Sequence, residues 1–404
     1  MRSLIEMNKN FKGENKMLNF TFYSPTYFAF GKGKQEEAGK LVSRFGGHKV
    51  LIHYGGGSVK RSGLLDAVCA SLQKENLPYL ELGGVKPNPR SGLVYEGIEL
   101  CRKEQVDFIL AVGGGSTIDS AKAIAAGAVY AGDFWDFYEG KLIEHALPVG
   151  TILTIPAAGS EGSPDSVITK EEGMLKRGAT GDAIRPCFSI LNPELTATLP
   201  KYQVACGGAD IMAHIMERYF TNTKEVEVTD RLCEGLFCTM LKELPKAVRN
   251  PADYDAQANI MWAGMTAHNN VVGVGREQDW ASHNIEHELS ALYDCAHGAG
   301  LSVIFPAWMR YVYKHDVMRF AQFAARVFGV TMDFQNPEET ALEGICRLQN
   351  FWSSLGLPVS FGELGAKEED ISFMADNIAY GETGLGNFVK LKAEDVKEIY
   401  RLAL

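Results

Sequence analysis

The sequence predicts an α/β N-terminal part followed by an all-α C-terminal part, and two observations support this prediction. Between about residues 20 and 199, short apolar runs alternate with helical patterns, which is typical of a parallel sheet covered by helices on both faces. Beyond about Pro200, strand signals largely vanish and long helical patterns follow one another. With 404 residues, two domains are also the better expectation from length alone.

The elements follow in a regular order along the N-terminal part. Each of the first three apolar runs is followed by a helical pattern, so we expect strands at 50–54, 79–82 and 106–112 and helices at 62–75, 92–104 and 117–129. A further strand is expected to begin near Thr151. The C-terminal part should contain helices at 228–244, 254–268 and 280–292. We therefore expect a flexible extension at 1–16 and domains at 17–199 and 200–404.

Composition narrows the class of protein. Hydrophobic residues make up 46% and charged residues 22%, which is ordinary for a soluble globular chain, and no apolar run reaches the length of a membrane span. The net charge of −10 disfavours nucleic acid as a partner. Eight scattered cysteines without a Cys-x-x-Cys pair indicate reduced thiols, and hence a cytoplasmic protein.

Two glycine-rich loops follow predicted strands. Gly113, Gly114, Gly115 and Ser116 stand between a strand and a helix, where backbone N–H groups and the helix dipole favour a phosphate. Asp119 lies in the first two turns of that helix. A tight turn without a ligand remains an alternative, since the G-x-G-x-x-G fingerprint is absent.

The earlier loop bears on which cofactor binds. It holds Gly55, Gly56 and Ser58, with Lys60 just beyond, and it lacks the acidic residue that commonly bonds the ribose 2′-OH of NAD. The glycines leave room for a 2′-phosphate, Ser58 offers it a hydroxyl and Lys60 a positive charge. We therefore expect NADP(H), with NAD(H) still possible. Thr151 and Thr154 are further candidates to contact a cofactor.

One aspartate and four of the nine histidines form a candidate metal site. Asp210 and His214 are spaced i, i+4, as are His283 and His287, so each pair shares a helix face. His297 stands beside Gly298 and Gly300 and should follow a bend. A carboxylate and several imidazoles suit Fe²⁺ or Zn²⁺.

These residues, in this order, resemble the iron-containing (group III) alcohol dehydrogenase family, and in particular its butanol dehydrogenase and NADPH-dependent aldehyde reductase branch. The resemblance runs from about Phe20 almost to the C-terminus. It implies a Rossmann-like dinucleotide-binding domain, a helical metal-binding domain, an active site between them and a homodimer.

The resemblance also implies roles for individual residues. The metal ligands would be Asp210, His214, His283 and His297, which leaves His287 beside the substrate as a proton relay. Lys176 falls where the NADPH-preferring branch has a cofactor-contacting lysine. Ala158, Asn192, Glu288 and Ala296 depart from common family residues, whereas all four ligand positions are intact.

We therefore expect reversible hydride transfer between NADP(H) and small alcohols or aldehydes such as butanol and butanal. A polyol (glycerol-type) dehydrogenase or a dehydroquinate-synthase-like enzyme on the same fold is the nearest alternative. A metal-dependent hydrolase without a nucleotide, or a non-catalytic nucleotide-binding protein, would belong to a different class.

Overall fold

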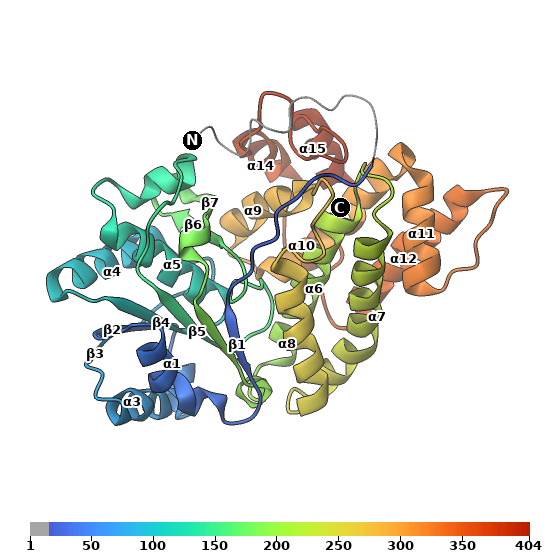
Figure 1. Cartoon of the computed structure of the whole chain (residues 1–404). Helices are drawn as coiled ribbons and strands as arrows, with labels where there is room; N and C mark the ends of the chain where they lie inside the picture. The colour runs from blue at the N-terminus through green and yellow to red at the C-terminus, as the bar shows by residue number, and fades with distance from the viewer. Residues whose placement is uncertain (1–15) are drawn as a thin grey trace.

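A computed structural model describes residues 16–404, and its N-terminal part is built on one six-stranded sheet (Figure 1). The predicted extension at 1–16 therefore lies outside the described residues, apart from its last residue. The sheet has the order β1-β8-β5-β4-β2-β3, and every neighbouring pair is parallel. Its strands are β1 (Tyr27–Phe30), β2 (Val50–Tyr54), β3 (Tyr79–Leu82), β4 (Phe108–Gly113), β5 (Val149–Leu153) and β8 (Phe188–Leu191).

Both faces of this sheet are buried, which explains why its strands are continuously apolar. Along β4, Ile109 and Ala111 pack in one hydrophobic cluster, whereas Leu110 and Val112 pack in another on the opposite face. This alternation follows from the two-residue period of a strand. The helices that cover the two faces are α1 (Ala38–Arg44), α2 (Ser58–Arg61), α3 (Leu64–Lys74), α4 (Ser91–Glu104) and α5 (Gly115–Val129).

The C-terminal part is helical, as predicted. Among residues 200–404 there is no strand, and the only sheet-like pairing is a single bridge between Leu385 and Leu391. The helices are α6 (Lys201–Tyr219), α7 (Glu227–Arg249), α8 (Tyr254–His268), α9 (Ala281–Tyr293), α10 (His297–Val312), α11 (Val317–Phe328), α12 (Pro337–Ser354), α13 (Phe361–Leu364), α14 (Ile371–Asn377) and α15 (Ala393–Arg401). The division into domains at 199/200 stays a prediction.

Two local features differ from expectation. The helix expected from Ser62 begins only at Leu64, because Gly63 has a φ of 74°, and a separate short helix precedes it. A two-stranded antiparallel hairpin, formed by β6 (Asp165–Lys170) and β7 (Leu175–Thr180), is also present and was not predicted. This hairpin lies between the sheet and α9, so it links the two parts of the molecule (Figure 1).

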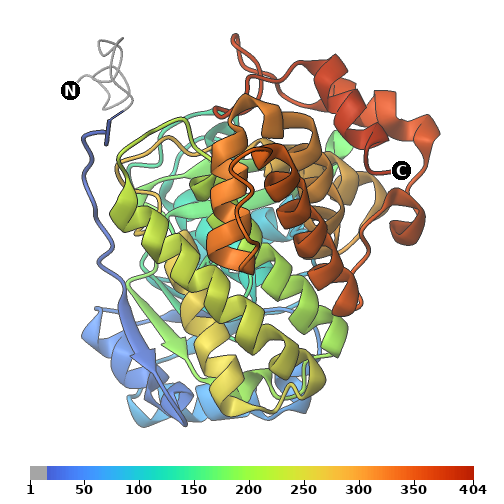
Figure 2. The same cartoon turned by 90° about the vertical axis from the view of Figure 1, so that its right-hand side faces the viewer.

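The chain before β1 runs outside the sheet. In Figure 2 this segment, in dark blue, follows one side of the molecule in an extended course, and the N–H of Leu18 donates to the carbonyl of Gly275 at 2.8 Å. Within residues 16–404, none of the helices has both the length and the apolar character needed to cross a membrane.

Candidate metal and cofactor site

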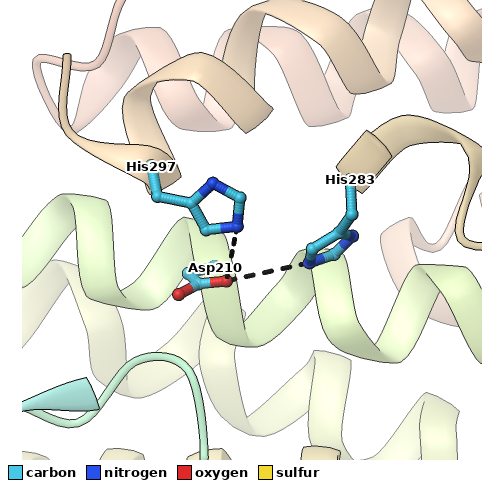
Figure 3. A group of neighbouring side chains, drawn as sticks. All are labelled: Asp210, His283 and His297. Atoms are coloured by element: carbon cyan, nitrogen blue, oxygen red, sulfur yellow. Dashed lines mark ion pairs between the residues drawn. The ribbon is translucent and has the colours of Figure 1, made fainter. Parts of the chain in front are cut away.

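Three of the predicted ligands meet where three helices converge (Figure 3). Asp210 lies on α6, His283 lies in the first turn of α9, and His297 is the first residue of α10. Asp210 and His283 are buried and His297 is half-buried. The two imidazoles approach the carboxylate of Asp210 from different sides, so the three side chains face a common point.

The distances leave room for an ion among these groups. The Nε2 atoms of His283 and His297 each lie 3.9 Å from the same oxygen, Oδ1 of Asp210. Neither Asp210 Oδ1 nor His283 Nε2 has a hydrogen-bond partner, although both atoms are buried. Leaving such an atom unpaired costs about 1–3 kcal/mol. The ligand atoms around a tetrahedral ion lie roughly 3.4 Å from one another, so a small inward movement of these side chains would let them bind Zn²⁺ or Fe²⁺.

A glycine lets the third helix approach closely enough. A Cβ on Gly298 would lie 1.9 Å from the carbonyl oxygen of Cys206, one helical turn before Asp210. No other residue fits there without moving α10 away from α6. The predicted bend before His297 is therefore followed by a close helix contact that brings its imidazole beside Asp210.

Each of the two histidines also contacts a buried carboxylate through its other ring nitrogen. Nδ1 of His283 lies 2.7 Å from Oε1 of Glu217, and Nδ1 of His297 pairs with Oε2 of Glu286. With Nδ1 protonated and donating, Nε2 keeps its lone pair on the side that faces Asp210.

His214 is placed differently from the other three predicted ligands. Its Nδ1 lies 2.9 Å from the backbone oxygen of Asp210 and 3.2 Å from Oδ1 of the same residue. Asp210, His283 and His297 each place one possible ligand atom within 4.8 Å of the others, and His214 is not part of this close group. His214 borders this group, with its ring centroid 4.6 Å from that of His283. Its role as the fourth ligand stays a prediction.

The histidines of α9 are neutral imidazoles. Burial is the main cause that lowers the pKa of His283 well below its usual value, and the same holds for His287. A neutral imidazole is the form that binds a metal or accepts a proton. The ring of His287 lies 5.5 Å from that of His297, measured between centroids, and it is half-buried. Its predicted role as a proton relay is untested.

Trp280 forms one wall of the site. Its indole packs edge-on against the rings of His283 and His214, at centroid distances of 5.1 and 5.9 Å. The residue has a φ of 67°, which is unfavourable for a bulky side chain. Oε2 of Glu217 accepts its backbone N–H at 2.6 Å and helps to hold this conformation.

The two glycine loops lie side by side. Strands β2 and β4 are neighbours in register, with Tyr54 opposite Val112, so Gly55 and Gly113 follow at adjacent strand ends. The chain leaves β2 toward β3 on one side and returns to β4 on the other, which makes this a topological switch point. Ligands of open α/β sheets bind in such a crevice.

The second loop begins helix α5 and is tightly packed on one side. A Cβ on Gly113 would lie 2.4 Å from Oγ1 of Thr117, whereas Gly114, Gly115 and Ser116 are half-buried. The first N–H groups of this 15-residue helix can therefore face an anion in the crevice.

The loop after β5 connects the glycine loop with the metal group. The N–H of Thr154 donates to the carbonyl of Gly113 at 3.0 Å. Two residues later, the carbonyl of Pro156 packs on Gly207 of α6, where a Cβ would lie only 2.4 Å away. Because Gly207 is one turn before Asp210, the switch point and the metal group open onto the same region.

Two predicted cofactor contacts are engaged within the protein. The carboxylate of Asp119 accepts hydrogen bonds from Ser160 Oγ and from the N–H of Val167, at 2.6 and 3.0 Å. Thr151 is fully buried and donates to Ser189 Oγ at 2.8 Å. Both residues shape the loops around the crevice, and their direct contact with a cofactor stays a prediction.

The two lysines predicted to contact the cofactor differ in exposure, since Lys60 is exposed and Lys176 is buried. Lys60 extends over the ring of Tyr54, with Nζ 5.2 Å from its centroid. Lys176, on β7, is buried, and its ammonium donates to Asn88 Oδ1 and Ser290 Oγ at 3.1 and 2.9 Å. It also lies 3.8 Å from Oε2 of Glu286, so it reaches the metal side of the molecule.

Several polar residues of the site were not predicted from the sequence. Glu286 forms a second close group with His287 and His297, within 4.8 Å. Its spacing of three residues from His283 could have identified it, since i, i+3 residues share a helix face. His268, which is not among the predicted site residues, has its ring centroid 4.2 Å from that of His214. Nothing in the local sequence indicates that contact.

Comparison with known proteins identifies the family. Residues 25–193 match the family model described as iron-containing alcohol dehydrogenase, and residues 204–404 match that of the C-terminal part of the same family. The probable NADH-dependent butanol dehydrogenase 2 of Bacillus subtilis is 44% identical over 96% of this chain and 100% of its own length. The NADPH-dependent aldehyde reductase YqhD of Escherichia coli is 36% identical over 96% of this chain and all of its own.

A solved structure agrees with the sequence comparisons. The crystal structure of NADH-dependent butanol dehydrogenase A from Thermotoga maritima has a TM-score of 0.93 and 42% identity, covering 96% of this chain and 99% of that chain. The predicted fold class, resemblance and general reaction class, alcohol and aldehyde oxidoreduction, are confirmed. This chain belongs to the iron-containing alcohol dehydrogenase family.

Proposed function

We propose that this protein is a metal-dependent alcohol dehydrogenase and aldehyde reductase that interconverts primary alcohols and aldehydes, such as butanol and butanal, with NADP(H). The observation that supports this most directly is the pair of buried atoms without a hydrogen bond, Asp210 Oδ1 and His283 Nε2, which face a common point with His297 Nε2. Such an arrangement is costly in a protein that binds nothing there.

The ion would be held by Asp210, His214, His283 and His297. One carboxylate and three neutral imidazoles leave a divalent ion with a net positive charge, and they suit Fe²⁺ and Zn²⁺ equally. When bound, the ion supplies a Lewis acid for the substrate oxygen. The residues themselves fix its position, because each comes from a helix packed in the core.

The cofactor would bind at the switch point. Gly113 to Ser116 and the start of α5 provide N–H groups for a pyrophosphate, and Thr154 adjoins them through its bond to Gly113. The nicotinamide supplies or accepts the hydride. The β5 loop that packs on α6 directs this end of the crevice toward Asp210.

His287 is our candidate for the proton step. It lies one turn beyond His283 on α9, and its burial keeps the imidazole neutral at physiological pH. In alcohol oxidation its ring would accept the hydroxyl proton, directly or through water, and in aldehyde reduction it would return one.

The preference for NADP(H) is a separate proposal. It is supported by the absence of an acidic residue between Gly55 and Lys60. The names of the two relatives differ on this point, since the Bacillus subtilis protein is called NADH-dependent and the Escherichia coli protein NADPH-dependent.

Substitution Gly55→Asp tests this preference. A Cβ at this position meets Thr117 Oγ1 and the Val85 carbonyl at 3.6 Å, an ordinary contact, so the backbone here accepts a side chain. Its carboxylate would repel a 2′-phosphate and accept from a 2′-OH, so the NADPH/NADH ratio of kcat/KM should fall by roughly tenfold or more. Gly55→Asn is the matched uncharged control. An unchanged ratio in the aspartate variant would show that this loop does not select the cofactor.

We also propose a cytoplasmic homodimer. The free state of all eight cysteines is typical of a reducing compartment. Strand β1 is an edge of the sheet, and exposed aromatic residues lie before and on it: Phe20, Phe22, Tyr23 and Tyr27. Light scattering coupled to size exclusion would give twice the monomer mass, and a strictly monomeric protein would refute the dimer.

The overall function is tested by metal analysis combined with turnover. The purified protein should contain about one iron or zinc ion per chain and should reduce a series of unbranched aldehydes with NADPH. Stripping the metal should abolish this activity, and readdition should restore it. Faster oxidation of glycerol than of butanol would favour a polyol dehydrogenase. Ester or amide hydrolysis without any binding of NADP(H) would favour the hydrolase.

A further inference from the structure

Glu286 is a buried acid whose position needs an explanation. It lies on α9 between His283 and His287, and its side chain has no exposed surface. Within residues 16–404, its Oε2 pairs with Nδ1 of His297, while its Oε1 has no hydrogen-bond partner. Burying a carboxylate with so few partners is costly. No backbone N–H of the described chain bonds to it, so it does not cap a helix.

The surrounding structure accommodates this carboxylate. A Cβ on Gly300 would lie 2.4 Å from Oε1 of Glu286, so the glycine on α10 leaves the space that the acid fills. Lys176 lies 3.8 Å from Oε2 and is kept there by Asn88 and Ser290. A positive charge at this distance offsets part of the cost of the buried negative charge.

The contact with His297 determines which ring nitrogen is free. Because Glu286 accepts from Nδ1, the lone pair of His297 lies on Nε2, the atom that is 3.9 Å from Asp210 Oδ1. In the same way, Glu217 on α6 accepts from Nδ1 of His283 on α9. Two helices thus present histidines with the same tautomer to one point, and an outer carboxylate of this kind orients a ligand and raises its basicity.

We propose that Glu286 is a positioning residue that orients His297 for the metal and does not itself bind the ion. This inference rests on the proposed metal site, because it assigns Nε2 of His297 to the ion. The competing role is that of a direct ligand, since Glu286, His287 and His297 also form a close group. The two roles differ in whether the coordination around the ion changes when Glu286 is replaced.

Metal affinity is the measurement that separates these roles. Metal-stripped protein would be titrated with Co²⁺ and Zn²⁺ against a chromophoric chelator, using the wild type, Glu286→Gln and His297→Ala. We expect Glu286→Gln to bind about 10–100-fold more weakly. At saturation its Co²⁺ absorption spectrum should match that of the wild type, whereas His297→Ala should change the spectrum. A wild-type affinity in Glu286→Gln would overturn the inference, and so would a spectrum altered as in His297→Ala.

A matched control lies two residues away on the same helix. Glu288 is also buried, but it pairs with Arg177 and Asn377 rather than with a histidine. Glu288→Gln should therefore keep the wild-type metal affinity within about twofold. An equal loss in both variants would indicate general damage to α9 and would contradict a specific role for Glu286.

Two further variants exclude indirect explanations. If the loss came only from leaving the charge of Lys176 without a nearby carboxylate, the double variant Glu286→Gln/Lys176→Met would regain wild-type affinity; we expect it to remain weak. Should the glutamine variant fail to fold by circular dichroism, Glu286→Asp keeps the charge but shortens the reach to Nδ1, and it should also weaken binding. If the wild type itself binds no metal, the proposed function fails rather than this assignment.

Discussion

Two buried polar clusters in this molecule differ in how completely they are paired. In the sheet half, the ammonium of Lys122 has no exposed surface, and its three N–H groups are shared among the Ser160 carbonyl and hydroxyl and the carbonyls of Ser163 and Asp165, at 2.7, 2.8, 3.0 and 2.7 Å. Asp119 beside it uses both carboxylate oxygens. All of these partners belong to the chain itself.

The helical half contains the contrasting cluster. There Asp210 Oδ1 and His283 Nε2 are buried, 3.9 Å apart and without a hydrogen bond, and Asp210 Oδ1 is approached by His214 Nδ1 at 3.2 Å. The difference indicates what each cluster is for. A cluster that is satisfied internally holds loops in place, whereas one that converges without satisfying itself is completed by a ligand. The first should therefore govern stability and the second metal binding.

The largest effect should come from removing a predicted ligand. His283→Ala should lose stoichiometric metal and reduce kcat/KM for butanal by at least roughly 10³-fold, because Lewis-acid stabilisation of the reacting oxygen is lost. Elemental analysis and NADPH oxidation measure the two effects on one sample. His48→Ala, an exposed histidine paired with Asp107, is the control. Retained activity in metal-free His283→Ala would refute the proposed mechanism.

The next effect should appear in stability and not in metal content. Lys122→Met removes the positive charge near Asp119 and leaves the carbonyls of Ser160, Ser163 and Asp165 without this donor, so the free energy of unfolding should fall by about 3–5 kcal/mol. Urea unfolding measures this loss, with the exposed Lys103→Met as control. Metal affinity measured below the unfolding transition should be unchanged. A loss of metal affinity without a loss of stability would reverse the roles of the two clusters.

The smallest effect tests an exception in the sheet half. Both carboxylate oxygens of Glu161 are buried and unpartnered, and burial raises the pKa of this group to about 7. The acid is protonated in the folded protein at pH 6 but ionised in the unfolded chain, so this residue's contribution to stability is lost as the pH rises toward and through 7.

Between pH 6 and pH 8.5 this contribution should fall by about 1 kcal/mol. Glu161→Gln should remove that part of the pH dependence, as measured by comparing urea unfolding of the two proteins at both pH values. If the variant and the wild type change equally with pH, Glu161 is ionised in the folded protein and has partners of its own.

The local elements could largely be predicted from the sequence because their signals are local. The strand at Val50–Tyr54 and the helix at Tyr254–His268 have the predicted ends, since apolar runs and helical periods need only neighbouring residues. The hairpin of β6 and β7 was missed because its strands, Asp165–Lys170 and Leu175–Thr180, are rich in polar and charged residues and form no part of the main sheet. Its importance arises from a distant contact between Lys176 and Glu286.

By itself, the sequence determined the fold class, the candidate ligands and the glycine loops. Residue type, spacing and order are sufficient for these, since a helix places i and i+4 on one face wherever it lies. Only the tertiary structure decided which ring nitrogen of His283 and His297 faces Asp210, because the carboxylates of Glu217 and Glu286 fix that choice from other helices or turns. Burial, hydrogen-bond partners and close helix approach depend on residues far apart in the chain, so no local pattern can specify them.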